Sequence, residues 1–154
     1  MSRNLATVDH VDQPTLEAFL ADRHHFVLVT NRRQGRPQLS PVTGGVHEGH
    51  LLIATYPERA KTTNLRRDPH ASVLVLSDDW DGPWVQIDGT AEVLDLPEAV
   101  EPLVTYYRVI AGEHPDWDEY RQAMIDQGKC LLRIRIEGWG PIATGGFPPR
   151  LASG

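Results

Sequence analysis

The stretch ATYPERAKTTNLRRDP, residues 54–69, gathers four cations within nine residues directly after an apolar run. The chain as a whole is acidic, with 21 Asp and Glu against 15 Lys and Arg and a formal net charge of −6. The four cations, Arg59, Lys61, Arg66 and Arg67, therefore indicate a local anionic ligand rather than a basic protein. The apolar run 51–55 predicts a strand that leads into a short helix.

Helix signals inside this stretch place its two leading cations near a helix start. Thr62 or Thr63 is expected to cap a helix that contains residues 64–67, and Pro69 is expected to end it. Unpaired backbone N–H groups at a helix start, with Arg59 and Lys61 beside them, favour binding of a phosphate group. A solvated basic turn is the alternative that spacing alone leaves open.

Length and composition predict one domain, residues 1–154. The chain has 154 residues, 40% of them hydrophobic, which is enough for a single core. Its acidic balance argues against nucleic-acid binding, which needs many cations on one face. The single cysteine, Cys130, excludes an internal disulfide framework and is expected to be a buried apolar residue. No apolar leader or membrane-spanning run is found, so a cytoplasmic location is expected.

Outside the opening stretch, the pattern predicts mainly strands. Six segments have the alternating or β-branched composition of strands: residues 25–30, 38–42, 51–55, 71–76, 84–93 and 131–136. Residues 31–36 predict a hairpin turn, residues 44–47 lead to a tight turn at 48–49, and Pro41 requires an edge or irregular position.

Helical periodicity appears at three further places. Asp12 or Thr15 is expected to cap a helix over residues 16–20. Residues 99–111 keep helical spacing, with Pro97 near the start, and Pro102 is expected to break or restart this helix. A second apolar stripe, residues 117–124, ends at Gly128, a favoured capping residue. The predicted class is α+β, mainly β: an antiparallel β-barrel of six or more strands with peripheral helices.

The motifs resemble a known superfamily. Residues 59–65, Arg-Ala-Lys-Thr-Thr-Asn-Leu, followed by Asp68-Pro69, resemble the flavin-phosphate motif of the split β-barrel flavin and deazaflavin oxidoreductases, which include pyridoxamine 5'-phosphate oxidase. Residues 39–42 resemble the strand that lines the isoalloxazine ring, and residues 52–55 resemble the strand before the phosphate motif. Residues 88–93 are similar to the long-strand signature. The likeness spans roughly residues 15–140 and is greatest to the actinobacterial group that uses coenzyme F420.

This resemblance implies a split barrel of the FMN-binding type and a homodimer with two cofactor sites between its subunits. It implies an F420-dependent oxidoreductase that transfers a hydride between the reduced deazaflavin and an unsaturated small molecule, without a catalytic side chain. The alternatives are an FMN-dependent oxidase or reductase of the same superfamily and a non-catalytic F420 carrier. The residues expected to bind the cofactor are Ser40, Pro41, Val42, Ile53, Ala54, Thr55, Arg59, Ala60, Lys61, Thr62, Asn64 and Gln86.

Two further regions are assigned on weaker grounds. The C-terminal tail, residues 138–154, is rich in Gly and Pro and is expected to be too irregular to form a regular element. Its Trp139 and Phe147 are expected to cover the site of the partner subunit, with a frayed terminus as the alternative. Arg32, Arg33 and Arg36 in the hairpin are candidates for binding the oligoglutamate tail of F420, although a solvated turn accounts for them equally.

Several activities are disfavoured by what the sequence lacks. No Glu-Phe-Trp-Gln-Gly stretch is present, so oxidation of pyridoxamine phosphate is not expected, and a haem ligand late in the chain is missing because the last histidine is His114. No metal is expected: the pairs His24-His25 and His47-x-x-His50 lack a helical metal-binding pattern, and residues 78–84 lack a calcium-loop register. No Ser or Cys lies in a nucleophile motif.

Overall fold

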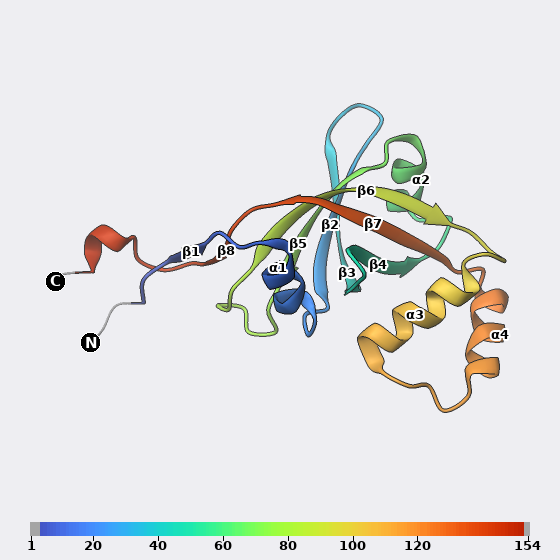
Figure 1. The fold of residues 1–154 in the computed structure, drawn as a ribbon. Helices are drawn as coiled ribbons and strands as arrows, with labels where there is room; N and C mark the ends of the chain where they lie inside the picture. Colours follow the sequence, from blue (N-terminus) through green and yellow to red (C-terminus); the bar gives the residue numbers. More distant parts are fainter. Residues whose placement is uncertain (1–3, 153–154) are drawn as a thin grey trace.

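The computed structural model describes residues 4–152, which form a closed six-stranded barrel with helices around it (Figure 1). The strands are β1 (Thr7–Asp9), β2 (His25–Asn31), β3 (Pro37–His47), β4 (His50–Thr55), β5 (His70–Leu76), β6 (Val85–Leu94), β7 (Cys130–Trp139) and β8 (Ile142–Thr144). The helices are α1 (Gln13–Leu20), α2 (Ala60–Arg67), α3 (Val100–Ala111), α4 (Trp117–Gln127) and a 3-10 turn, η1 (Pro149–Leu151). The barrel order is β2-β3-β4-β7-β6-β5 with antiparallel pairing throughout, which confirms the predicted class.

Alternation along the strands fills the barrel. On β2, Phe26 and Leu28 point inward and are buried, while Val27 between them is only partly buried. Helix α1 adds Leu16 and Leu20, both fully buried, to this core. The Asp12 carboxylate caps α1 by accepting a hydrogen bond from the Thr15 N–H at 3.0 Å. Asp12 was one of the two predicted caps.

Strand β3 is one continuous strand, where the sequence predicted two separate segments. It pairs with β2 from Pro37 to Thr43 and with β4 only from Gly44 to His47. The two glycines after Thr43 allow this continuity, because a Cβ at Gly44 would overlap the ring of Phe26 and a Cβ at Gly45 would overlap Val109 of α3. Pro41 lies in the part of β3 that is paired with β2 alone, which agrees with the predicted edge position.

The helical predictions late in the chain need one correction. Helix α3 runs unbroken through Pro102, because this proline lies in the first turn, where its missing N–H has no intrahelical acceptor to lose. Gly128 ends α4 in the left-handed conformation with φ of 66°, as predicted. Residues of α3 and α4 form a second core with β4 and β7, where the buried Tyr120 hydroxyl donates to the Leu103 carbonyl oxygen at 2.9 Å.

The tail contains regular structure, contrary to the prediction. Strand β8 pairs with β1, with Thr7 opposite Thr144, and their hydroxyl oxygens lie 2.7 Å apart. The two strands form an arm that extends away from the barrel and carries both ends of the described chain (Figure 1). Strands of only three residues leave no periodicity to detect, and their pairing depends on residues far apart in sequence.

Two further observations concern the chain as a whole. Cys130 is buried, as expected, and burial raises the pKa of its thiol. Among residues 4–152, no helix is long and apolar enough to cross a membrane.

The close packing of β6 against β7 predicts contrasting effects of two glycine substitutions. In Gly89→Ala the new Cβ would overlap the Arg135 carbonyl oxygen of the neighbouring strand, so we expect a loss of about 1–3 kcal/mol in unfolding free energy. Gly138→Ala, in the facing part of β7, meets no atom within 4 Å and is expected to change stability by less than about 0.5 kcal/mol. Urea denaturation of both variants measures the difference, and equal losses would contradict the packing argument.

Candidate functional site

The candidate site lies where β3 and β4 part. Their pairing ends at Gly44 and Ile53, so the earlier residues of β3 and the last two of β4 have no strand between them. The expected residues Ser40, Pro41 and Val42 occupy the open edge of β3, and Ala54 and Thr55 occupy that of β4. A flat heterocycle with hydrogen-bond donors and acceptors on its rim matches such an edge.

Ser40 supports a ligand at this edge. Its hydroxyl oxygen is buried and makes no hydrogen bond to any described residue. An unsatisfied buried polar atom costs free energy, and native structures usually provide it with a partner. A polar ligand group in the gap between β3 and β4 would supply one.

Other expected residues position the site instead of facing it. The Ile53 side chain is fully buried in the barrel core, and its backbone is paired with both Gly44 and Leu132. Thr55 is also nearly buried, which leaves only its backbone at the open edge for a ligand. The Thr62 hydroxyl is buried and donates to the Tyr56 carbonyl oxygen at 2.8 Å. Asn64, also buried, donates its amide to the Thr30 hydroxyl at 3.1 Å. These bonds fix α2 against the barrel.

Helix α2 begins earlier than predicted. Arg59 is its N-cap residue and no side chain caps the helix, so the expected cap at Thr62 or Thr63 is wrong. The carbonyl oxygen of Arg59 accepts the N–H groups of both threonines, at 3.1 and 3.2 Å. The backbone N–H groups of Ala60 and Lys61 precede these and have no acceptor within the helix. They lie beside the two leading cations and can bind an anion.

Arg59 and Lys61 carry positive charge that the described residues do not neutralise. No carboxylate in residues 4–152 forms an ion pair with either side chain, whereas Arg66 binds both oxygens of Asp95, at 2.6 and 2.8 Å. Burial first, and then the nearby charge of Arg59, lower the pKa of Lys61 from its usual value. An anion bound here would be attracted by both side chains and would stabilise the charged lysine.

Two members of this cluster, Tyr56 and Lys129, were not predicted from the sequence. The ammonium group of Lys129 lies 4.3 Å from the centre of the Tyr56 ring, and the Arg59 guanidinium lies 5.7 Å from it. The Thr55–Cys130 register brings Lys129 to this end of the barrel. No local pattern links residues that far apart, so only the strand pairing reveals the third cation.

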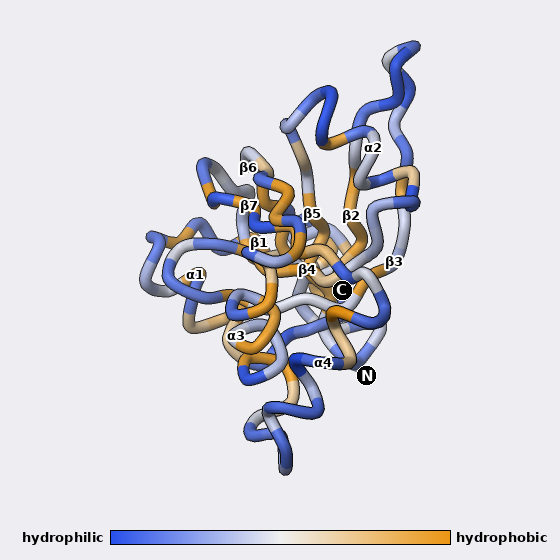
Figure 2. Tube along the Cα trace, turned by 90° about the vertical axis from the view of Figure 1, so that its right-hand side faces the viewer, coloured by the Kyte–Doolittle hydropathy of each residue, from blue (hydrophilic) through white to orange (hydrophobic). Residues whose placement is uncertain are grey.

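The two ends of α2 face different basic groups. The β2–β3 hairpin, which carries Arg32, Arg33 and Arg36, projects beyond the barrel on the α2 side, and Figure 2 shows its hydrophilic tip. It lies near the C-terminal end of α2, where Arg67 donates to the Asn31 carbonyl oxygen. Eight helical residues span about 12 Å, which sets the scale between the hairpin and the Arg59–Lys61 end.

Gln86 does not join this cluster within one chain. It lies exposed on the outer face of β6, opposite Leu74, and its amide is 3.4 Å from the Asp88 carboxylate. Trp139 donates its indole N–H to the Val11 carbonyl oxygen at 2.9 Å and packs against the barrel of its own chain. Phe147 is half-exposed on the arm, where its backbone bonds to Asn4 and Ala6. The expected role of Gln86 in cofactor binding, and those of Trp139 and Phe147 toward a partner subunit, stay predictions.

No metal-binding group of side chains is found in the part of the chain that the structure describes. Residues 4–152 contain no group of three or more His, Cys, Asp or Glu side chains that could hold a metal ion. One buried group far from the cluster, the Tyr120 phenol, has its pKa raised to about 12 by burial.

The fold and the site geometry together define a class of protein. Its members are small antiparallel barrels in which two neighbouring strands separate next to the positively charged N-terminus of a helix. The chain belongs to the pyridoxamine 5'-phosphate oxidase family, whose model matches residues 12–143. The resemblance to this superfamily is thereby confirmed, and the barrel is a flavin-type cofactor-binding fold.

Similar solved structures agree on this fold. A conserved hypothetical protein from Mycobacterium tuberculosis is 25% identical, with a TM-score of 0.71 over 87% of this chain and 86% of that one. An F420 reductase is 16% identical, with a TM-score of 0.61 over 80% and 94%. A FAD-binding protein from Mesorhizobium loti is 16% identical, with a TM-score of 0.62 over 91% and 98%.

The unneutralised cations predict an unusual lysine titration. We expect the Lys61 pKa to lie below that of a solvent-exposed lysine and to rise in Arg59→Ala, which removes one of its two causes. Phosphate affinity should fall as the pH rises through the Lys61 pKa, because only the ammonium form attracts the anion. NMR of ¹³C-dimethylated lysine, assigned with Lys61→Arg, measures this pKa with and without inorganic phosphate.

The control for this titration is Arg66→Ala. Arg66 lies on the same helix, but Asp95 already neutralises it. The Lys61 pKa should therefore change much less than in Arg59→Ala, and equal changes would refute a specific Arg59–Lys61 interaction.

Proposed function

We propose that the protein is an F420-dependent oxidoreductase, which transfers a hydride between the reduced deazaflavin and an unsaturated small-molecule substrate. The observation that carries this proposal is the unneutralised Arg59–Lys61 pair at the start of α2, beside the open edge of β3. Family membership and the likeness to an F420 reductase support a cofactor that combines a phosphate with a flat ring.

The residues of this chain fit such a cofactor in separate roles. Arg59 offers a planar fork to two phosphate oxygens, Lys61 a point charge, and the first N–H groups of α2 further donors. The backbone of residues 40–42 offers the ring an unpaired edge, and the Ser40 hydroxyl gains the partner it lacks.

A deazaflavin bound here would supply the hydride and solvent would supply the proton that completes the reduction, so the chemistry would require no acid or base from the protein. The protein contributes by orienting the ring and the substrate and by excluding water between them.

F420 is favoured over FMN by the hairpin cations. Beyond its phosphate, F420 continues into a lactyl and oligoglutamate chain, whereas FMN ends at the phosphate. Arg32, Arg33 and Arg36 lie on the α2 side of the barrel, within reach of an extended tail that starts at the Arg59–Lys61 end. Each exposed carboxylate–arginine pair contributes about 0.2–1 kcal/mol, a gain that FMN cannot make.

Cofactor titrations test this choice. We expect F420 to bind more tightly than FMN, and its affinity to fall more steeply between low and high salt, because exposed ion pairs are screened within about 10 Å at 0.1 M salt. The triple variant Arg32→Gln, Arg33→Gln, Arg36→Gln should reduce the F420 affinity and leave the FMN affinity unchanged. Tighter binding of FMN at both salt concentrations would instead favour an FMN-dependent oxidoreductase on the same barrel.

The phosphate role is tested in the same titrations by the double variant Arg59→Ala, Lys61→Ala. Two charge-assisted contacts contribute about 1.5–3 kcal/mol each, so binding of either cofactor should weaken well beyond tenfold. Riboflavin, which lacks the phosphate, should bind equally to native protein and variant. An unchanged F420 dissociation constant would refute the assignment of these residues.

We also propose that the protein is a homodimer with the cofactor between its subunits. The outer faces of β2, β3 and β5 carry a continuous row of apolar side chains, here named the outer apolar face: Val27, Val29, Leu39, Pro41, Leu74 and Leu76. Leu39 is 58% exposed although it lies within strand β3. Contiguous apolar surface of this kind marks an interface, and a second copy would bring Gln86, Trp139 and Phe147 toward the partner's site.

A charge on this face should break the dimer. In Leu39→Glu, association would bury a carboxylate, so we expect the dimer of the native protein to become a monomer at micromolar concentration. The control Ile125→Glu alters a similarly exposed apolar residue on α4 and should leave the dimer intact. Light scattering measures both, and a native monomer that binds cofactor would refute the proposal.

A further inference from the structure

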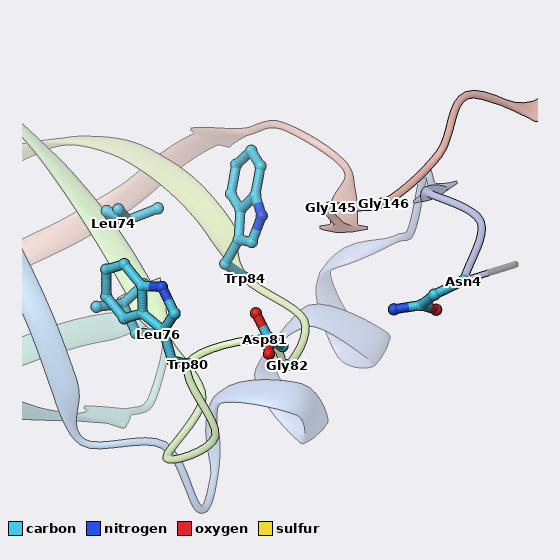
Figure 3. A pocket seen from close by; sticks show the side chains of 9 residues that line it. All are labelled: Asn4, Leu74, Leu76, Trp80, Asp81, Gly82, Trp84, Gly145 and Gly146. Atoms are coloured by element: carbon cyan, nitrogen blue, oxygen red, sulfur yellow. The ribbon is translucent and has the colours of Figure 1, made fainter.

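One cavity of the described chain lies outside the cofactor cluster. It has a volume of about 520 Å³ and lies between the outer side of β5, the loop that joins β5 to β6, and the arm (Figure 3). Leu74 and Leu76, which also belong to the outer apolar face, form part of its wall, so the cavity borders the proposed subunit interface. Gly145, Gly146 and Asn4 line it on the arm. Small-molecule sites commonly have volumes of about 300–1,000 Å³.

Two indoles line this cavity, one largely exposed to solvent and the other partly exposed. Trp80 is 84% exposed and Trp84 is 39% exposed. Backbone hydrogen bonds between Trp84 and Ala143, at 2.9 and 3.0 Å, hold Trp84 between the barrel and the arm. Figure 3 shows Trp80 beside Leu76, with the Trp84 ring set apart from it. Exposed aromatic faces beside aliphatic side chains suit a flat apolar ring.

The charge at the cavity is negative. The Asp81 carboxylate lines it and forms no ion pair with any described residue, while the backbone N–H of Asp81 donates to the Asp79 carboxylate at 3.0 Å. Asp78, in the same loop, has only His25 as a possible cationic partner among the described residues, at 3.4 Å. No Lys or Arg of the described chain belongs to the lining. A ligand with a positive charge is therefore favoured over an anion.

We propose that this cavity binds a flat aromatic ligand that carries a positive charge, such as a protonated ring nitrogen or an aryl amine. Trp is the side chain that most strongly attracts a cation over its ring, and Asp81 adds direct charge attraction. Both features select the same ligand class, whereas an anionic aromatic molecule satisfies only the apolar wall.

The cavity lies close to the open edge of β3. Leu76 lines a second cavity, of about 300 Å³, together with Pro41 and Val42 of β3. Strand β2 separates β5 from β3 in the barrel, so the ligand would lie two strands away from that edge. That it is the substrate of the hydride transfer rests on the proposed function, whereas its binding does not.

Binding of 9-aminoacridine, a flat fluorescent cation at neutral pH, tests the proposal on the full chain. We expect saturable binding by fluorescence polarisation, weakened about fivefold or more in Trp80→Ala and in Trp84→Ala. Asp81→Asn, which keeps the side-chain shape, should weaken binding about two- to fivefold. The flat anion 9-anthracenecarboxylate and the globular cation 1-adamantylammonium should each bind less tightly than 9-aminoacridine.

Matched variants test whether the dye binds at this cavity and not elsewhere on the surface. Ile125→Ala removes an exposed apolar side chain from α4, and Asp118→Asn removes a 99% exposed carboxylate, so neither should alter dye binding. The variants Trp80→Ala and Asp81→Asn should retain F420 affinity, which makes a failure here distinct from a failure of the cofactor proposal. Equal dye affinity in native protein and both tryptophan variants would overturn the inference. The inference would also be overturned if Trp80→Ala lost the dimer but kept its dye affinity, because the Trp80 indole would then belong to the subunit interface.

Discussion

Two adjacent glycines in β3 let an aromatic ring and a helix approach the same backbone from opposite sides. Phe26 packs against Gly44 from inside the barrel, and Val109 of α3 packs against Gly45 from outside. Where β3 and β4 part, the Tyr106 hydroxyl donates to the Thr43 carbonyl oxygen at 3.1 Å, so α3 satisfies an acceptor that β4 no longer reaches. These contacts hold β3 in place where it is not paired with β4, so its open edge can stay unpaired when no ligand is bound.

Charged side chains also differ by region in whether they have an ion-pair partner. Several arginines outside the cluster are held by carboxylates: Arg66 by Asp95, Arg121 by Glu101 and Arg133 by Glu92. The cations at the start of α2 have no such partner among the described residues, so an acidic protein keeps a local positive field where α2 begins. At the other side of the barrel, the loop after β5 leaves carboxylates without arginine partners in the described chain. The barrel therefore carries local charges of opposite sign at two places on its surface.

The sequence was sufficient to predict features with a local physical cause. Alternation identified the six barrel strands, the Asp12 side chain marked the start of α1, and Gly128 marked the end of α4. Features decided by distant residues were missed. Lys129 joins the cluster through the β4–β7 pairing, and the single strand β3 depends on contacts of Gly44 and Gly45 that no local pattern reports. The first residue of α2 was mispredicted because Thr62 donates its hydroxyl to the Tyr56 carbonyl oxygen, inside the turn that precedes the helix. A capping preference describes isolated helix starts, and tertiary contacts decided this one.

The arm also bears on how the chain is made. Strand β1 emerges first during synthesis, yet its partner β8 follows more than a hundred residues later, so β1 waits as an unpaired edge while the barrel assembles. The barrel shares this delay, since β4 must pair with β7 across the intervening α2, β5, β6, α3 and α4. Folding of such non-local topology is slow, and the growing chain is most open to wrong strand pairing before residue 144 leaves the ribosome.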